Sequence, residues 1–273
     1  MSNVAVMPLV DYQDACNTIR DITGGVDNIV SGELKPEIQK VYEAGEKAEN
    51  GRMWDYIQNY GNRTGYSTAF NSWSCEYIRP IHKVVPSATN SRASTFSENN
   101  NLKKVEKEYF DFSQVPRGTY ASQSWYYTWS NCRGLEEIED IGIKNIFSLD
   151  NTFRTCQSLH TIACIYPDKD TKFNQPFIGC NSLVNIRIGD GCVIGQDINF
   201  QWSPLSVESA MSVMNALESF SGTGNEYEKT VYFSDKTKEL LDQLGQFVFE
   251  FAPDQWIEGT WETAIGAKGW MAG

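Results

Sequence analysis

The sequence predicts an α/β protein in which a short solenoid of repeated coils lies between a helical N-terminal module and an α/β C-terminal cap. Two observations predict the solenoid: a ten-residue pattern recurs in register along the middle of the chain, and its apolar residues are three apart, a spacing that neither a helix nor a strand keeps for long. Alternating helical and strand-like segments near the C-terminus predict the cap. The predicted boundaries are 1–65, 66–203 and 204–273.

The repeat is clearest in the segments "WSNCRGLEEI", "FRTCQSLHTI" and "FIGCNSLVNI". Its four anchor positions recur at a step of 24 residues, as from Cys132 to Cys156 and from Cys156 to Cys180. An earlier copy, "FSENNNLKKV", has Asn99 in the cysteine position, 33 residues before Cys132. A period of roughly 20 to 29 residues with Leu, Ile and Asn or Cys anchors is typical of leucine-rich repeats.

Stacking follows because one such unit cannot bury its apolar residues alone. We expect about four to five coils, with like residues over like, and a short strand from the leucine to the isoleucine of each copy that pairs with the next coil. The aromatic residue fills the wide side of the core and the cysteine lies at the bend. The predicted repeat core is Phe96, Leu102, Trp129, Cys132, Leu135, Ile138, Phe153, Cys156, Leu159, Ile162, Phe177, Cys180, Leu183 and Ile186.

Beyond Cys192 the repeat fades and the cap is predicted to begin. A helix is expected over 206–220, with Ser206 as its N-cap. A strand over 230–234, a helix over 235–245 and a helix over 261–270 that leads into a last strand complete the cap.

The N-terminal module is predicted to contain three helices, over 11–25, 31–51 and 52–62. In the second helix Leu34, Ile38, Val41 and Ala48 follow a heptad spacing, which predicts an oligomerisation or attachment seam about two heptads long. Gly45 interrupts the seam, and packing of this helix on its own domain is the alternative interpretation.

Charge and composition exclude several classes of partner. The net charge of −12 would repel phosphate backbones, so no nucleic acid is expected. No apolar run approaches the length of a membrane span, and the N-terminus lacks the features of a signal peptide, so we expect synthesis in the cytoplasm and no membrane insertion. The seven cysteines form no C-x-x-C pair, which favours buried thiols over a metal site, and no cofactor is expected.

The repeat F-x-x-C-x-S-L-x-x-I resembles BspA-like leucine-rich repeats. The N-terminal pattern around Tyr12, Cys16 and Ile19, and the C-terminal segments "SPLS", "TVYFS" and "KGW", resemble structural proteins of phages and prophages of Gram-positive gut bacteria. The resemblance implies a virion component of the tail or baseplate, whose partners are other virion proteins, copies of itself, or a glycan or protein of the host surface. Segment 245–261 departs from this resemblance and is interpreted as an insertion.

Catalysis has little support in the sequence, and we expect no catalytic residue and no metal ligand. Of the two histidines, His160 lies at a repeat position that varies between copies, as surface positions do. The acidic segment "GLEEIEDIG" could supply two carboxylates for glycoside hydrolysis, although such clusters are common on solvated faces. A carbohydrate-degrading enzyme on a repeat scaffold and a bacterial cell-surface adhesin remain alternatives.

Binding is the function that the sequence favours. Aromatic residues crowd the segment "YASQSWYYTW", where they either bind a ligand or cover the insertion between two repeats. The outward positions of the predicted strands form a second candidate surface. The candidate ligand-binding residues are Tyr120, Trp125, Tyr126, Tyr127, Glu137, Glu139, Thr161, Asn185 and Arg187.

Overall fold

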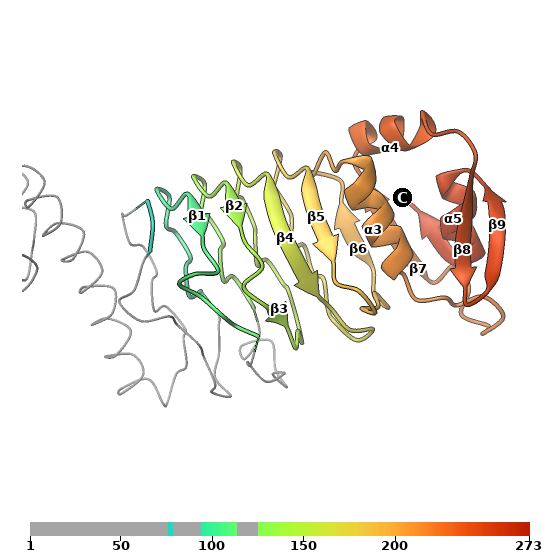
Figure 1. Cartoon of the computed structure of the whole chain (residues 1–273), viewed down its shortest axis with the longest axis horizontal. Helices are drawn as coiled ribbons and strands as arrows, with labels where there is room; N and C mark the ends of the chain where they lie inside the picture. Colours follow the sequence, from blue (N-terminus) through green and yellow to red (C-terminus); the bar gives the residue numbers. More distant parts are fainter. Residues whose placement is uncertain (1–75, 79–93, 114–124) are drawn as a thin grey trace, which may run out of the picture.

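The computed structural model describes residues 76–78, 94–113 and 125–273. Within them, successive turns of the chain lie side by side along the long axis, and a mixed helical and strand segment closes the C-terminal end (Figure 1). The predicted N-terminal module, including Leu34, Ile38, Val41 and Ala48, lies outside the described residues, as does Tyr120.

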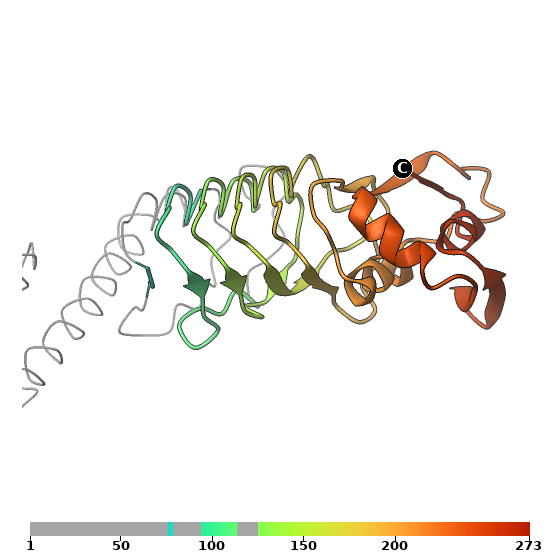
Figure 2. The same ribbon diagram turned by 90° about the horizontal axis from the view of Figure 1, so that it is seen from above.

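A five-stranded parallel sheet runs along one side of this stack (Figure 2). Its register follows the repeat, because Ile138 pairs with Ile162 and Ile162 pairs with Ile186. The strands are short and begin after the repeat leucines. This corrects the predicted extent, since the amide of Leu135 still bonds to the carbonyl of Cys132 in the turn, 3.1 Å away. The strands are β1 (Lys104–Val105), β2 (Glu137–Ile138), β3 (Ile143–Lys144), β4 (Thr161–Tyr166) and β5 (Asn185–Ile188).

The turn that precedes each strand also bonds to the neighbouring coil. The Trp129 N–H donates to the Thr152 carbonyl at 2.9 Å, and the Phe153 N–H donates to the Pro176 carbonyl at 3.0 Å. Each turn has two residues with positive φ at fixed positions, which bend the chain inward and produce the three-residue spacing of apolar side chains. These residues are Ser94, Glu98, Tyr127, Asn131, Asn151, Thr155, Gln175 and Gly179.

Aromatic rings form a continuous column inside the stack. The rings of Trp129 and Phe153 are 5.3 Å apart and nearly parallel, and those of Phe153 and Phe177 are 5.6 Å apart with an interplanar angle of 3°. Each residue predicted for the repeat core is buried, with at most 3% of its surface exposed. Like residues therefore pack on like residues from one coil to the next.

The repeat cysteines form a second column of buried thiols. Cys132, Cys156 and Cys180 each donate a hydrogen bond to the carbonyl of the aromatic residue in the preceding coil, at 2.9, 3.0 and 3.0 Å. Burial raises the pKa of Cys132 and of Cys180 to about 12. Thiols held in this protonated form serve packing and stay unreactive.

The stack continues past Cys192, where the sequence predicts that the rhythm fades. The Phe177 ring lies 4.6 Å from that of Phe200, which lies 6.4 Å from that of Phe233, so the column gains two members. They belong to a second parallel sheet, which spans the boundary predicted between 203 and 204. Its strands are β6 (Ile198–Phe200), β7 (Lys229–Phe233) and β10 (Trp270–Ala272), in the order β10-β7-β6.

Helix α3 (Val207–Ala216) ends the first sheet by occupying the place of a further strand. Ser206 caps the helix, as predicted. The hydroxyls of Ser209 and Ser212 accept hydrogen bonds from the backbone amides of Ile186 and Ile188, at 2.9 and 3.0 Å. These amides would otherwise form an open edge, which invites pairing with another chain.

The remaining cap contains two helices and a hairpin. Helix α4 (Asp235–Asp242) begins at the N-cap Ser234, and helix α5 (Trp261–Ala267) at the N-cap Thr260. Between them, β8 (Phe247–Ala252) and β9 (Gln255–Gly259) pair antiparallel around a tip in which Asp254 has φ of 60°. Segment 245–261, interpreted from the sequence as an insertion, contains this hairpin. None of the described helices is both long and apolar enough to cross a bilayer.

Candidate functional site

The outward face of the first sheet carries an aligned row of polar side chains. This row runs from Lys104 through Glu137 and Thr161 to Asn185, because these residues pair in register on successive strands. The Lys104 ammonium lies 3.2 Å from a Glu137 carboxylate oxygen and 2.7 Å from one of Glu139, so it bridges the two carboxylates at the N-terminal end of the sheet. The hydrogen bond to Glu139 raises the pKa of Lys104.

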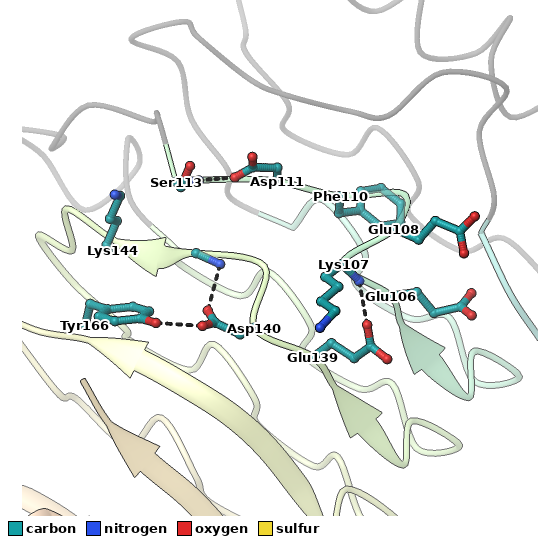
Figure 3. Close-up of a pocket in the computed structure, with 11 residues that line it drawn as sticks. Glu106, Lys107, Glu108, Phe110, Asp111, Ser113, Glu139, Asp140, Lys144 and Tyr166 are labelled. Atoms are coloured by element: carbon teal, nitrogen blue, oxygen red, sulfur yellow. Dashed lines mark hydrogen bonds between the residues drawn. The ribbon is translucent and has the colours of Figure 1, made fainter. Parts of the chain in front are cut away.

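A groove of about 760 Å³ opens where the chain turns between β2 and β3 (Figure 3). The turn at Asp140 and Gly142 forms one wall, and the segment after β1 forms the other. Gly142 has φ of +76°, and a Cβ at this position would lie 2.7 Å from the Ser113 nitrogen, so the two walls approach too closely for a side chain. The lining residues are Glu106, Lys107, Glu108, Phe110, Asp111, Ser113, Glu139, Asp140, Gly142, Lys144 and Tyr166.

Hydrogen bonds hold two carboxylates of the segment "GLEEIEDIG" in this groove, the predicted Glu139 and its neighbour Asp140, whereas the predicted Glu137 lies outside the groove lining. Asp140 accepts from the Tyr166 hydroxyl at 2.6 Å and from the Gly142 amide at 3.2 Å (Figure 3). Glu139 accepts from the Lys107 amide at 2.9 Å. The hydrogen bond to Asp140 also raises the pKa of Tyr166, which keeps the phenol protonated.

The electrostatics of Glu139 do not suit a general acid. Partial burial opposes its ionisation, but the hydrogen bonds from Lys104 and from the Lys107 amide outweigh this effect and lower its pKa. A glycosidase acid needs the opposite shift, because it must carry a proton at neutral pH. Among the described residues, no group of three His, Cys, Asp or Glu side chains is arranged to hold a metal ion.

A second pocket, of about 430 Å³, lies between the sheet face and helix α3. It brings together Thr161, Asn185 and Arg187, three of the predicted binding residues, with Glu208 of the helix. The Asn185 amide donates to the Thr161 hydroxyl at 3.3 Å, and one Arg187 nitrogen lies 2.8 Å from each Asp190 carboxylate oxygen. The residues that line this pocket therefore carry a hydroxyl, an amide, a guanidinium and a carboxylate, a set suited to polar ligands.

The predicted aromatic surface is wrong for Trp125. Its side chain is fully buried, with its ring 5.4 Å from that of Trp129 and 5.2 Å from that of Phe112. The position four residues before each aromatic anchor also faces the core, since Leu149 and Phe173 are buried in the next two coils. Tyr126 and Tyr127 are half-buried, with ring centroids 4.3 Å apart and edge to face. His160 is exposed, as a variable repeat position suggests.

A third pocket, of about 800 Å³, lies between the last coils and the cap. Lys268 lines it, and its ammonium donates to the carbonyls of Asn215 and Leu217 at 2.8 and 2.9 Å, so it caps the C-terminal end of α3. Burial lowers the pKa of Lys268 to about 8. The sequence singled out this lysine only as part of the segment "KGW" and not as a site residue, because its partners are backbone atoms more than 50 residues away.

Other site residues were missed for a similar reason. Lys107 and Tyr166 reach the first groove from segments that the repeat does not align. Ser209 and Ser212 accept hydrogen bonds from β5 only because α3 packs beside that strand. The one available signal was the spacing of the two serines, which places them on one face of a helix.

Comparison with protein-family models, with curated proteins and with solved structures finds no match to this chain.

Proposed function

We propose that the protein is a non-enzymatic structural component of a phage particle that acts as a binding module, in particle assembly or in recognition of the host surface. The proposal takes the stacked coils as a short leucine-rich-repeat solenoid of the BspA-like kind. Residues 1–65 would join the module to its own copies or to the tail or baseplate, and the sheet face would meet a host glycan or protein.

The aligned polar face is the observation that carries this proposal. The row from Lys104 to Asn185 is fixed by strand register over a buried core, so its outward groups are held at constant spacing. Preorganised polar groups lose little entropy on binding, which is the main advantage of a rigid scaffold for recognition. Asn185 and Arg187 are the most exposed of these groups and adjoin the pocket beside α3.

The enzymatic alternative has weaker support. Glu139 is tied to two lysine residues and has a lowered pKa, and Asp140 is held by a tyrosine hydroxyl. A bacterial surface adhesin would use the same face, so it differs from the proposal in location and not in chemistry.

Mass spectrometry of purified particles tests the structural assignment. We expect peptides of this chain in particles of the phage that encodes it, and their absence would end the virion proposal while leaving binding open.

The binding role is tested with the Arg187→Ala variant on immobilised host cells and on a glycan array. We expect it to bind at least tenfold more weakly than the unaltered protein. Lys236→Ala, which removes an exposed cation from α4, is the matched control and should bind normally. Equal binding by both variants would count against the sheet face.

A further inference from the structure

The β8–β9 hairpin has one exposed face, which lies at the C-terminal tip of the molecule (Figure 1). Val248 pairs with Glu258, and Glu250 pairs with Trp256, so these four side chains share one side of the hairpin. Val248 is 64% exposed and Trp256 is 61% exposed. The two apolar side chains are diagonal neighbours across the pair, close enough to form one patch with a carboxylate beside each.

The opposite face fixes the hairpin to the cap. Phe249 is buried, with 3% of its surface exposed, and its partner Ile257 packs against the same core. The Lys268 ammonium lies 5.5 Å from the centre of the Phe249 ring. The inner face therefore anchors the hairpin to the cap through Phe249 and Ile257, and the Trp256 side chain is not part of this packing.

The segment that carries this face has charged residues of a single sign, and Lys268 faces the hairpin from its other side. Residues 239–267 contain six acidic residues and neither lysine nor arginine. Two of the acidic residues, Glu250 and Glu258, are exposed on the same face as the tryptophan. An exposed indole attracts cations to its ring face, and carboxylates form strong hydrogen bonds with guanidinium and ammonium groups.

We propose that the outer face of the β8–β9 hairpin, formed by Val248, Glu250, Trp256 and Glu258, is a docking surface for a protein segment that carries arginine or lysine next to aliphatic side chains. The partner's cation lies over the Trp256 ring between the two carboxylates, and its aliphatic group packs on Val248. Tryptophan in such a setting is the residue type that contributes most to interfaces. This inference is independent of the recognition role proposed for the sheet face, from which it differs in both residues and charge.

The test measures binding of the full chain to a fluorescent peptide of alternating arginine and valine, by fluorescence anisotropy. Peptides with glutamine or glutamate in place of arginine report the contribution of charge. We expect the arginine peptide to bind and the other two to fail. Its affinity should fall at least tenfold in the Trp256→Ala variant. It should also fall at least tenfold in the separate double variant Glu250→Gln, Glu258→Gln.

Matched variants separate a defined site from attraction to an acidic protein. Trp202→Ala removes another exposed tryptophan, and Glu106→Gln with Glu108→Gln removes two carboxylates from the first groove. These controls should bind the arginine peptide as the unaltered chain does, and circular dichroism should show that every variant is folded. Equal losses in control and hairpin variants would overturn the proposal.

Two other results would also overturn it, by identifying a different occupant. One is a glycan that binds in a Trp256-dependent manner while the arginine peptide is unaffected by the substitution. The other is self-association, seen by light scattering, that Trp256→Ala abolishes without any change in peptide binding.

Discussion

Removing one ring from the aromatic column tests whether the coils stabilise one another as a stack. Phe153 is fully buried, with parallel rings 5.3 Å away on one side and 5.6 Å away on the other. Phe153→Ala should lower the free energy of unfolding by about 3–5 kcal/mol, the cost of a large buried cavity. In this variant both neighbouring rings lose a stacking partner, and each such contact contributes about 0.5–1.5 kcal/mol.

Phe153→Leu separates ring stacking from cavity formation, since leucine keeps most of the apolar volume. It should cost about 1–3 kcal/mol, chiefly the two lost ring contacts. Phe220→Ala is a control outside the column, because among the described residues this half-buried ring has one ring contact, with Trp270 at a tilt, 5.8 Å away. We expect it to cost less than Phe153→Ala.

The assay is urea unfolding followed by circular dichroism and by tryptophan fluorescence, whose transitions must coincide for the free energies to be meaningful. A loss below about 1 kcal/mol for Phe153→Ala would refute the reasoning, because a buried phenylalanine in a close-packed column cannot be removed so cheaply. Equal losses in Phe153→Ala and Phe153→Leu would assign the whole effect to the ring contacts and none to the cavity.

Three further predictions concern single contacts. The pKa of Lys268 is about 8 in the fold and about 10.5 when exposed, so between these pH values the unfolded chain binds more protons and the free energy of unfolding rises with pH. Urea unfolding at pH 8 and pH 10 should show this rise in the unaltered chain and not in Lys268→Met, and the same pH dependence in both would contradict the prediction. Gly134→Ala places a Cβ against a backbone carbonyl of the neighbouring coil and should destabilise the fold by about 1–3 kcal/mol, whereas Gly266→Ala, in open space on α5, should stabilise the fold slightly. A higher melting temperature for Gly134→Ala than for Gly266→Ala would refute the predicted overlap. The double variant Ser209→Ala, Ser212→Ala leaves two backbone amides of β5 without acceptors, so it should lower the free energy of unfolding by about 1–3 kcal/mol for each amide. It should also promote association of sheet edges, which light scattering would detect, whereas an unchanged melting temperature would show that water replaces the hydroxyls.

Local spacing in the sequence predicts the interior of the stack well. The four anchors of each copy align Ile138 with Ile162 and Ile186, and those are the pairs that the sheet contains. The reason is physical: in a stack each position meets its own equivalent, so a periodic sequence specifies its own contacts. The same logic placed the cysteines in a column of buried thiols.

Features outside the four anchor positions could not be found in this way. Trp125 looked exposed because the repeat assigned the core position to Trp129, yet the position four residues earlier is buried as well, as Leu149 and Phe173 are in the next two coils. Phe200 and Phe233 continue the column from segments without cysteine or leucine anchors. The hairpin carries a turn signal, proline followed by aspartate, but its face and its partners depend on how the cap packs.

The way the column ends explains why the tip of the molecule is free for a different partner. Within the described residues the rings lie nearly parallel from Phe96 to Phe233, and the next ring, Trp261, meets Phe233 edge to face at 73°. A perpendicular ring offers no parallel face for a further coil, and α3 covers the β5 edge of the first sheet with hydroxyls. A repeat that is complementary to itself would otherwise add copies without limit. The cap thus prevents both stacking of a further ring and pairing at the β5 edge. The surface around Trp256 can therefore be apolar and exposed without extending the stack, and the acidic residues beside it favour a basic partner.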